Sequence, residues 1–430
     1  MKDKNLYLRN YWGIGVNKIN LYKEKGSLNL ELALMLAFLI LSIFFSIAFL
    51  GNRISNAFMT AGSSIRDGNI GNYNTANGNV TDPLIIGTNG GYGEGNHYVS
   101  DNAPAVDNSL WSFTLNSDGN SYTAIGYSGN AESVSVPYSY KGLSVTSVSG
   151  RYSTDMGITI NPIFNISNKT TKRVYIPNTI TSIGWYTFYG TALTNLYIPS
   201  SVVSIGEHSF HNCHSLEEIS LPNSIKSLGS DCFHNCDILT KVNIPKDITI
   251  LDSSTFYGCS KLTSISIPNN VSEIKYACFA SSGLISIDIP DSVKIMESHI
   301  FYDCQSLINV RLPKDLKILD TYTFAYCSKL PTIVLPEGLT TIKEFSFYEC
   351  TSLGNIILPW NLELIETSAF NYCTSLTAIR IPDGTNLQEN CFRYCTNLTV
   401  YINDPHNQYP VDITWYLGCK SGINLYKLPE

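Results

Sequence analysis

The stretch Val202-Val-Ser-Ile-Gly-Glu-His-Ser-Phe210-His-Asn-Cys213-His-Ser-Leu-Glu-Glu-Ile-Ser-Leu-Pro222 recurs, with changes, down the C-terminal half of this 430-residue chain. Ten such units follow one another, with a usual spacing of 23 residues, as from Pro222 to Pro245. A unit this short cannot bury its own apolar side chains, so it must stack on copies of itself. The period therefore predicts a β-rich solenoid.

Two residues mark every unit, a proline and a phenylalanine. The prolines are Pro177, Pro199, Pro222, Pro245, Pro268, Pro290, Pro313, Pro336, Pro359 and Pro382, and the phenylalanines are Phe188, Phe210, Phe233, Phe256, Phe279, Phe301, Phe324, Phe347, Phe370 and Phe392. Ile219 and Leu221 are two apart, so they point to one side of a short strand while Ser220 points to the other. Proline ends this strand, and the phenylalanine is expected to plug the convex side.

Composition and charge limit the class of function. Only 15% of the residues are charged and the net charge is −7, which argues against nucleic-acid binding because phosphate neutralisation needs basic stripes. The chain has no Ser-His-Asp order, no H-E-x-x-H and no G-x-S-x-G, and its acidic residues form no recurring pair. We therefore expect no enzyme activity and no cofactor.

The composition changes along the chain predict six segments. They are a basic cytoplasmic leader (1–26), a transmembrane or pilin-like helix (27–61), a Gly/Asn/Ser-rich linker (62–108), a β cap with a degenerate repeat (109–173), the repeats (174–402) and a C-terminal cap (403–430). Asp118-Gly119 is a hairpin turn signal within the β cap. Such a cap would cover the first repeat, whose stacking face would otherwise be wet.

An apolar run at Leu32–Leu50 is long enough to span a bilayer as a helix. Six basic residues against two acidic ones precede it within residues 1–26. This predicts a single-pass membrane protein with a cytoplasmic N-terminus and extracellular repeats. A cleaved secretory signal is the alternative, although the run is longer than a usual signal core.

The repeats resemble the BspA-like leucine-rich-repeat family. Leu262-Thr-Ser-Ile-Ser-Ile-Pro268, the Val202-to-Cys213 stretch and the lead-in Tyr127-Ser-Gly-Asn-Ala-Glu-Ser-Val-Ser-Val-Pro137 match that family's pattern. The resemblance covers over half the chain. It implies a right-handed leucine-rich-repeat superhelix of about ten 22–23-residue repeats, on a cell-surface protein that binds host or neighbouring-cell proteins or glycans.

The segment Lys25-Gly26-Ser27-Leu28-Asn29-Leu30-Glu31 resembles a type IV prepilin processing site, and the stretch through Phe58 is similar to Flp-type pilins. The resemblance implies cleavage after Gly26, with Ser27 as first mature residue and Glu31 pairing with a neighbour's amine. Two residues depart from the pattern of these pilins: Ser27 takes the place of the usual Phe, and Leu32 takes the place of a frequent Tyr. A plain signal anchor stays open beside pilin-type self-assembly.

Eight of the twelve cysteines share one repeat position: Cys213, Cys236, Cys259, Cys304, Cys327, Cys350, Cys373 and Cys395. Disulfide formation and metal ligation are two alternative roles for these cysteines, but the favoured role is that of a small buried side chain that fills space in the core. The units starting at Pro177 and Pro268 lack this cysteine and are one residue short, which suggests that the thiol fills a pocket of the longer turn.

Three histidines, His208, His211 and His214, lie three apart beside Cys213, and His234 follows one unit later. Zinc needs three or four converging ligands. These histidines occupy a turn where other units carry Tyr, Ser or Asp. We therefore predict packing rather than metal binding, and no metal site.

The outward strand positions should form a ladder on the concave face, where solenoids usually bind ligands: Tyr197, Ser220, Asn243, Ser266, Asp288, Arg311, Val334, Ile357 and Arg380. Val334 and Ile357 are apolar at predicted exposed positions, with Arg311 and Arg380 as a polar rim. A second row beside the phenylalanines is rich in Tyr and His. The sequence thus predicts a membrane-tethered adhesion or binding protein, with a pilin-like subunit as the alternative.

Overall fold

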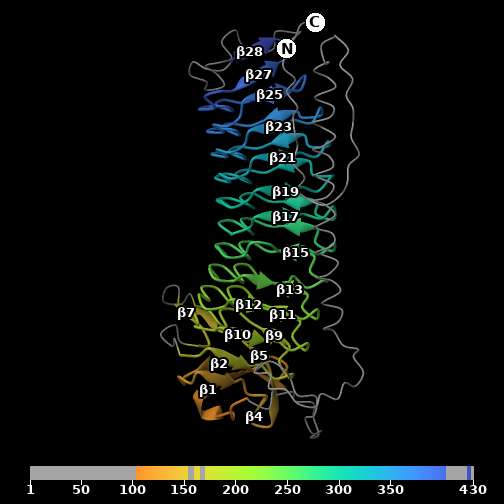
Figure 1. Cartoon of the computed structure of the whole chain (residues 1–430). Coiled ribbons are helices and arrows are strands. Elements are labelled where there is room, and N and C mark those ends of the chain that lie inside the picture. Colours follow the sequence, from red (N-terminus) through yellow and green to blue (C-terminus); the bar gives the residue numbers. More distant parts are fainter. Residues whose placement is uncertain (1–102, 154–158, 165–169, 403–423, 428–430) are drawn as a thin grey trace, which may run out of the picture. The chain divides into compact units, whose positions relative to one another are not determined.

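The computed structural model describes residues 103–153, 159–164, 170–402 and 424–427, all within one compact unit, Ile85–Glu430. This part of the chain is a β-solenoid of about 12 turns, so the predicted solenoid is confirmed. Figure 1 shows the coils piled one above another, with β1 at one end and β28 at the other. The predicted membrane segment, Leu32–Leu50, lies outside the described residues.

One row of short strands follows the Leu-x-x-Ile-x-Ile-Pro part of each coil, and we call the surface that it presents the strand face. The row comprises β3 (Ser133–Ser135), β8 (Arg173–Tyr175), β10 (Asn195–Tyr197), β12 (Glu218–Ile219), β14 (Lys241–Val242), β17 (Ser286–Asp288), β19 (Asn309–Arg311), β21 (Thr332–Val334), β23 (Asn355–Ile357), β25 (Ala378–Ile381), β27 (Thr399–Ile402) and β28 (Asn424–Lys427). Neighbouring strands that pair within this row are parallel, as β21 and β23 are. The row is interrupted at Ser264–Ser266, where the backbone forms no strand.

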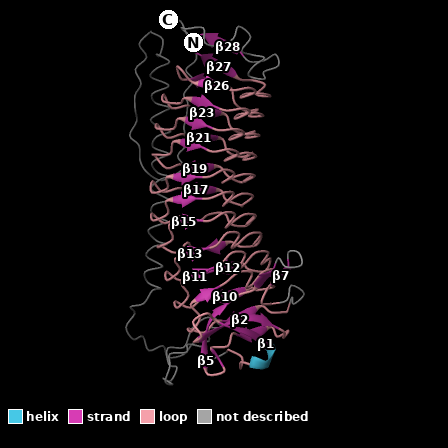
Figure 2. Cartoon of the chain, turned by 180° about the vertical axis from the view of Figure 1, so that it is seen from behind, coloured by secondary structure: helices cyan, strands magenta, loops and turns pink. Residues whose placement is uncertain are grey.

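A second row of strands lies on the far side of each proline turn. It comprises β2 (Ser121–Tyr127), β5 (Leu143–Val148), β9 (Ser182–Ile183), β11 (Ser204–Ile205), β13 (Ser227–Leu228), β15 (Ile250–Leu251), β16 (Glu273–Ile274), β18 (Ile295–Met296), β20 (Ile318–Leu319), β22 (Thr341–Ile342), β24 (Leu364–Ile365) and β26 (Asn386–Leu387). Figure 2 shows, from behind, these strands joined by the loops of each coil.

The N-terminal end is closed by antiparallel structure. The strand β1 (Trp111–Leu115) follows the 3-10 helix η1 (Asn108–Leu110) and pairs antiparallel with β2, so the expected Asp118-Gly119 hairpin is present. The strand β4 (Ser139–Tyr140) folds back on β5, and β6 (Arg151–Ser153) pairs with β7 (Thr159–Asn161). Since β5 pairs in parallel with β9, the cap is continuous with the first repeat.

The core is a column of phenylalanine rings, one per coil. Phe164, Phe188, Phe210, Phe233, Phe256, Phe279, Phe301, Phe324, Phe347, Phe370 and Phe392 are all fully buried. Consecutive rings stack face to face, for example Phe233 on Phe256 at 5.6 Å and Phe256 on Phe279 at 5.6 Å between centroids. Trp111 meets Phe164 edge-on at 6.2 Å and ends the column at the cap.

Each phenylalanine sits in a tight turn flanked by two left-handed residues. His208 (φ 54°) and Asn212 (φ 59°) flank Phe210, and the other repeats have the same two positions. The N–H groups of His208, Phe210 and Asn212 donate to carbonyls of the next coil at 3.0, 2.9 and 2.8 Å. The turns therefore form a second hydrogen-bonded ladder, and we call the surface that they present the turn edge.

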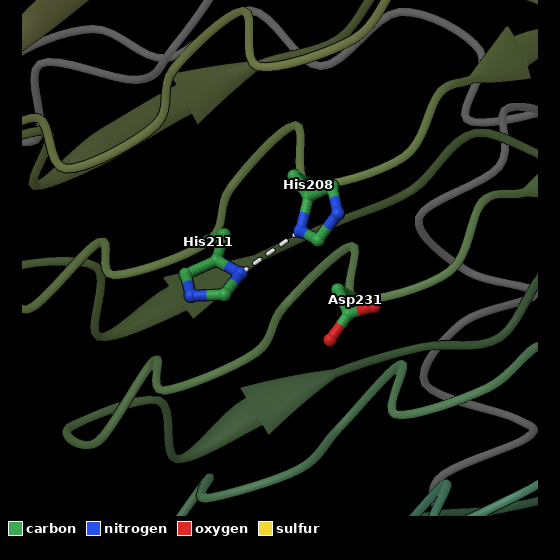
Figure 3. Close-up of side chains that lie close together, drawn as sticks. All are labelled: His208, His211 and Asp231. Carbon is green, nitrogen blue, oxygen red and sulfur yellow. Dashed lines mark hydrogen bonds between the residues drawn. The ribbon is translucent and has the colours of Figure 1, made fainter. Parts of the chain in front are cut away.

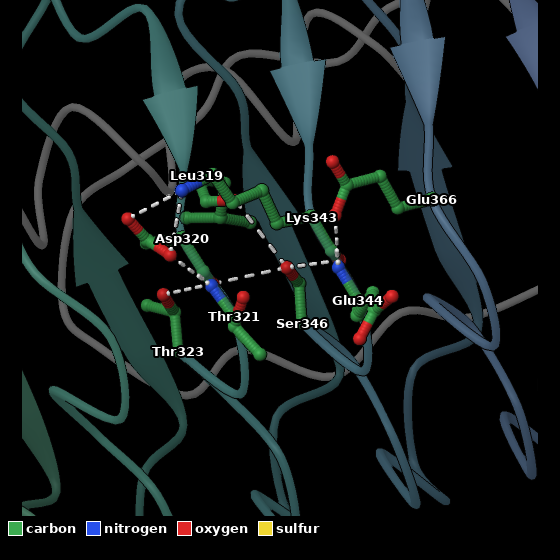
Figure 4. A network of polar contacts seen from close by, with 8 residues as sticks. All are labelled: Leu319, Asp320, Thr321, Thr323, Lys343, Glu344, Ser346 and Glu366. Carbon is green, nitrogen blue, oxygen red and sulfur yellow. Dashed lines mark hydrogen bonds and ion pairs between the residues drawn. The ribbon is translucent and has the colours of Figure 1, made fainter.

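Polar side chains also join successive coils. Lys343 donates to Asp320 of the preceding coil at 2.9 Å, and Ser346 donates to the Asp320 carbonyl at 3.1 Å (Figure 4). The pair Lys275–Asp252 repeats the same contact three coils earlier in the stack. Partly exposed pairs of this kind are worth about 0–1 kcal/mol each, so ring burial dominates the stability.

Candidate functional site

All nine predicted ladder residues, Tyr197, Ser220, Asn243, Ser266, Asp288, Arg311, Val334, Ile357 and Arg380, are exposed on the strand face. Parallel pairing places Asp288 beside Arg311, Arg311 beside Val334 and Val334 beside Ile357. The ladder side chains are exposed because side chains alternate along a strand, and the residues on either side of each ladder position point into the core. The binding role of these residues stays a prediction.

Three ladder residues, Asn243, Asp288 and Arg311, serve the scaffold itself. The Asn243 amide accepts from the Leu221 N–H and donates to the Leu221 carbonyl, both at 2.8 Å, at the coil after which the strand row is interrupted. Arg311 donates to Asp288 at 3.1 Å and to the Ile289 carbonyl at 2.7 Å, and it pairs with Asp291 at 3.0 Å. These side chains stabilise the sheet and are less available to a ligand.

An apolar patch lies further along the strand face, and we define the strand-face patch as Val334, Ile357, Trp360 and Arg380. Val334, Ile357 and Trp360 are 82%, 79% and 71% exposed, far more than other large apolar residues of the described chain. The Arg380 guanidinium lies 5.0 Å from the Trp360 ring centre. Ile357, Trp360, Arg380 and Tyr401 line one shallow hollow. Such a cluster has the composition of an interface core with a cationic edge.

Trp360 was not among the predicted site residues, although the sequence holds a signal for it. The residue after the repeat proline is polar in every other unit, for instance Asn223, Lys246 and Glu337. Trp360 alone breaks this pattern. A large aromatic residue at an otherwise solvated position indicates a surface function.

The aromatic row beside the phenylalanines forms a column on the turn edge. Tyr302, Tyr326, Tyr348, Tyr372 and Tyr394 follow one another with ring centres 4.3–5.9 Å apart. Burial, together with the Glu349 carboxylate, raises the pKa of Tyr348 to about 12. The hydroxyl stays protonated at neutral pH, and ring packing accounts for the column.

The repeated cysteines are buried, and no disulfide joins them within the described residues. Each donates its thiol to the carbonyl of the phenylalanine in the preceding coil, as Cys236 does to Phe210 at 3.1 Å. Burial raises the pKa of Cys304 to about 11 and that of Cys236 higher still. The favoured filler role agrees with this geometry.

The suggested link between the cysteine and a longer turn needs correction. In the two short units, Thr191 and Ser282 occupy the cysteine position and contact the next cysteine, at 3.6 Å to Cys213 and 3.4 Å to Cys304. The position therefore exists in both turn lengths, and the missing residue lies after it. At Gly283 a Cβ would come 2.1 Å from the Ser260 carbonyl oxygen, so the shortened turn packs closely on the preceding coil.

The histidines divide into two groups. His208 and His211 face each other with 3.1 Å between their Nδ1 atoms, and Asp231 of the next coil lies beside them (Figure 3). His234 binds Asp231 at 2.7 Å. His214 points away and pairs with Asp237 at 2.8 Å, while Cys213 is buried in the core. His214 and Cys213, which neighbour these histidines in the sequence, therefore do not converge with them.

Burial sets the protonation of this cluster. It lowers the pKa of His208, and with the neighbouring His234 and His208 it lowers the pKa of His211 to about 4. Both imidazoles are therefore neutral near pH 7. Two imidazole nitrogens and one carboxylate are groups that can hold a divalent metal ion.

The predicted processing residues, Gly26, Ser27 and Glu31, lie outside the described residues, as does the run 32–50. A search of the described ranges finds no helix with the length and hydropathy needed to traverse a lipid bilayer. Leader cleavage and membrane insertion therefore stay predictions.

Solved structures share the fold. A leucine-rich repeat protein from Bacteroides ovatus is 21% identical, with 76% of this chain and 99% of that chain covered and a TM-score of 0.51. A leucine rich cell surface protein from Faecalibacterium prausnitzii is 23% identical over 76% and 95% of the two chains, also with a TM-score of 0.51. The pneumococcal vaccine antigen PcpA is 17% identical over 75% and 98%, with a TM-score of 0.50. No curated protein matches the chain.

A family model, the BspA type leucine rich repeat region, matches residues 181–308 and 273–399 with six copies. These ranges together span more than half of the chain and coincide with the coils whose phenylalanine, cysteine and aliphatic positions are buried. The chain is therefore a member of the BspA type leucine rich repeat family.

Proposed function

We propose that this protein is a non-enzymatic cell-surface binding protein whose strand-face patch docks a protein on a host or neighbouring cell. The observation that carries the proposal is the exposure of Val334 and Ile357 side by side on the sheet, with the exposed Trp360 in the turn that follows Ile357. Exposing such a cluster to water is unfavourable, and contact with a partner's apolar surface removes it from water.

The chemistry of the patch favours a protein partner over a glycan. Val334 and Ile357 offer aliphatic surface that has no hydrogen-bonding group, whereas sugars need polar partners together with aromatic rings. Arg380 beside Trp360 adds a cation at the edge of the patch. A carboxylate on the partner would complement it, giving an apolar centre with an acidic rim.

Membrane attachment through residues 32–50, with the N-terminus cytoplasmic and the repeats outside, belongs to the same proposal. Its support is the apolar run and the basic residues that precede it. A pilin-type role depends on cleavage after Gly26. N-terminal sequencing of the mature protein tests whether this cleavage occurs. An intact leader would exclude prepilin processing.

The test begins with a screen of the full chain against matrix proteins, surface proteins and glycans. The double variant Val334→Asp/Ile357→Asp should keep the wild-type circular dichroism and melting temperature, because both side chains point into solvent. It should bind the captured protein at least about tenfold more weakly, as expected when charges enter an apolar contact.

The matched control is Ser220→Asp/Ser266→Asp, which places the same charges on the same face outside the patch. Equal loss of binding in this control would mean a general charge effect. Unchanged binding in the patch variant would overturn the strand-face patch as the docking site, and capture of glycans alone would overturn the protein partner.

A further inference from the structure

Two neighbouring coils bring three metal-ligating side chains together on the turn edge. His208 and His211 lie two residues before and one residue after Phe210, and Asp231 lies two residues before Phe233. Stacking of the coils therefore puts Asp231 directly below His208. One ligand atom from each of the three residues lies within 4.8 Å of the other two, and all three side chains are half-buried (Figure 3).

The distances suit a small divalent ion. With zinc–nitrogen bonds of about 2.0–2.1 Å, two nitrogens on a tetrahedral zinc lie about 3.3 Å apart. The Nδ1 atoms of His208 and His211 are 3.1 Å apart. One carboxylate oxygen of Asp231 lies within 4.8 Å of a ring nitrogen of each histidine, and a tetrahedral ion has a fourth position that water can fill.

The surroundings hold the ligands in place. Tyr186 stacks on His208 at 4.6 Å and His234 stacks on His211 at 4.3 Å, so both imidazole planes are fixed from outside the cluster. His234 also binds the Asp231 carboxylate at 2.7 Å, the kind of support that metal-bound carboxylates normally have.

The other described coils lack this combination. In the other repeats the residue at the position of His208 is Tyr186, Asp231, Ser254, Ala277, His299, Tyr322, Phe345, Ser368 or Asn390. His299, the other histidine at this position, has Tyr276, Tyr302 and Tyr322 around it and no carboxylate within the same kind of cluster. Among the described residues, no other group of this type converges.

We propose that His208, His211 and Asp231 form a binding site for one divalent transition-metal ion of the zinc class. The ion joins two consecutive coils at the turn edge and keeps one coordination position open. This site is separate from the strand-face patch, and it reverses the expectation from sequence that these histidines only pack.

The test uses the full chain without a histidine tag, purified in detergent and stripped with a chelator. Titration calorimetry with zinc chloride should show one ion per chain. Asp231→Asn keeps the shape of the side chain and its acceptor for His234, and it should weaken zinc binding at least about tenfold, as should His208→Gln. His214→Gln removes an exposed histidine of the same coil and should leave zinc binding unchanged.

Cobalt provides a readout that does not depend on any variant. Cobalt bound to wild-type protein should give the visible bands of a four- or five-coordinate nitrogen and oxygen site, without a thiolate charge-transfer band. A thiolate band would assign the ion to the cysteines and overturn the proposal. Zinc binding that is equally strong in Asp231→Asn, or absent from the wild-type protein, would overturn it as well.

Discussion

At the scale of single residues, the turn conformation is the most demanding feature. Two residues per coil adopt a left-handed backbone, and most of them are not glycine. This conformation costs roughly 1–2 kcal/mol for an ordinary residue because Cβ approaches the following carbonyl. Small and polar residues such as Ser254 and Asn235 tolerate it best, and they recur at these positions.

Ser254 (φ 52°) tests the left-handed turn directly. Replacement Ser254→Val puts a β-branched side chain into this conformation and should lower the free energy of unfolding by about 1–2 kcal/mol. Ser254→Gly should cost less than about 0.5 kcal/mol, because glycine adopts this φ freely. Urea unfolding measures both.

The control for this prediction is Ser253→Val, one residue away in ordinary backbone. It should unfold close to the wild-type midpoint. If Ser253→Val destabilised the protein as much as Ser254→Val, the loss would come from the bulk of valine and the turn argument would fail.

The buried thiols give a second prediction at this scale. Because burial raises the pKa of Cys304 to about 11 and raises the pKa of Cys327 and Cys373 as well, these groups stay as thiols at pH 8. Native protein treated with iodoacetamide should show no labelling of the eleven described cysteines by peptide mass mapping. Labelling should become complete in urea.

The raised thiol pKa values also determine whether the folded state gains or loses stability as the pH rises. The folded-state thiol pKa lies above the unfolded value of about 8.5, so the associated stability is present below pH 8.5 and is lost as the pH rises toward the folded pKa. Rapid labelling of a repeat cysteine in native protein at pH 8 would contradict the burial of these thiols.

At the scale of the repeat element, the phenylalanine column is the main source of stability. Each ring is fully buried and contacts the rings of the coils before and after it. Phe256→Ala should therefore lower the free energy of unfolding by about 3–5 kcal/mol. Its neighbour Tyr257 is half-buried on the turn edge, so Tyr257→Ala should cost about 1 kcal/mol or less.

Urea unfolding followed by circular dichroism compares the two variants. Since each coil contacts only its neighbours, the Phe256 variant should also show an earlier loss of structure around its own coil. Equal destabilisation by both variants would mean that the column does not dominate the packing.

The sequence predicts this element well because its signal is local. The phenylalanine, proline and alternating aliphatic residues recur at fixed spacing, and each is buried or placed as the period requires. The prediction that failed, the link between the cysteine and the longer turn, concerns contacts between coils, because Thr191 and Ser282 fill the same position against the next cysteine. The contact of His208 with Asp231, 23 residues later, also joins two coils and cannot be read from one unit.

The candidate site was predicted only in part for the same reason. Val334 and Ile357 follow from strand alternation, but the hydrogen bonds between the Asn243 amide and the Leu221 backbone join two coils and cannot be read from one unit of the sequence. Trp360 lies beyond the strand, so alternation could not place it on the patch. Trp360 and Arg380 belong to consecutive coils, so their contact can be seen only once the coils are stacked.

At the scale of the whole described solenoid, a rigid stack displays two separate surfaces. The strand face holds the patch of Val334, Ile357, Trp360 and Arg380, and the turn edge holds the histidines and tyrosines. Parallel ladders run along both surfaces, so neither needs to rearrange before contact. Preorganisation of this kind lowers the entropic cost of binding.

Side-chain footprinting of the captured complex tests the central claim, docking on the strand-face patch, most directly. Hydroxyl radicals oxidise exposed tryptophans, and Trp360 and Trp185 are 71% and 51% exposed in the free protein. The partner should protect Trp360 severalfold and leave Trp185, far from the patch in the sequence of coils, oxidised as before. Protection of Trp185 with Trp360 unchanged would contradict docking on the strand-face patch.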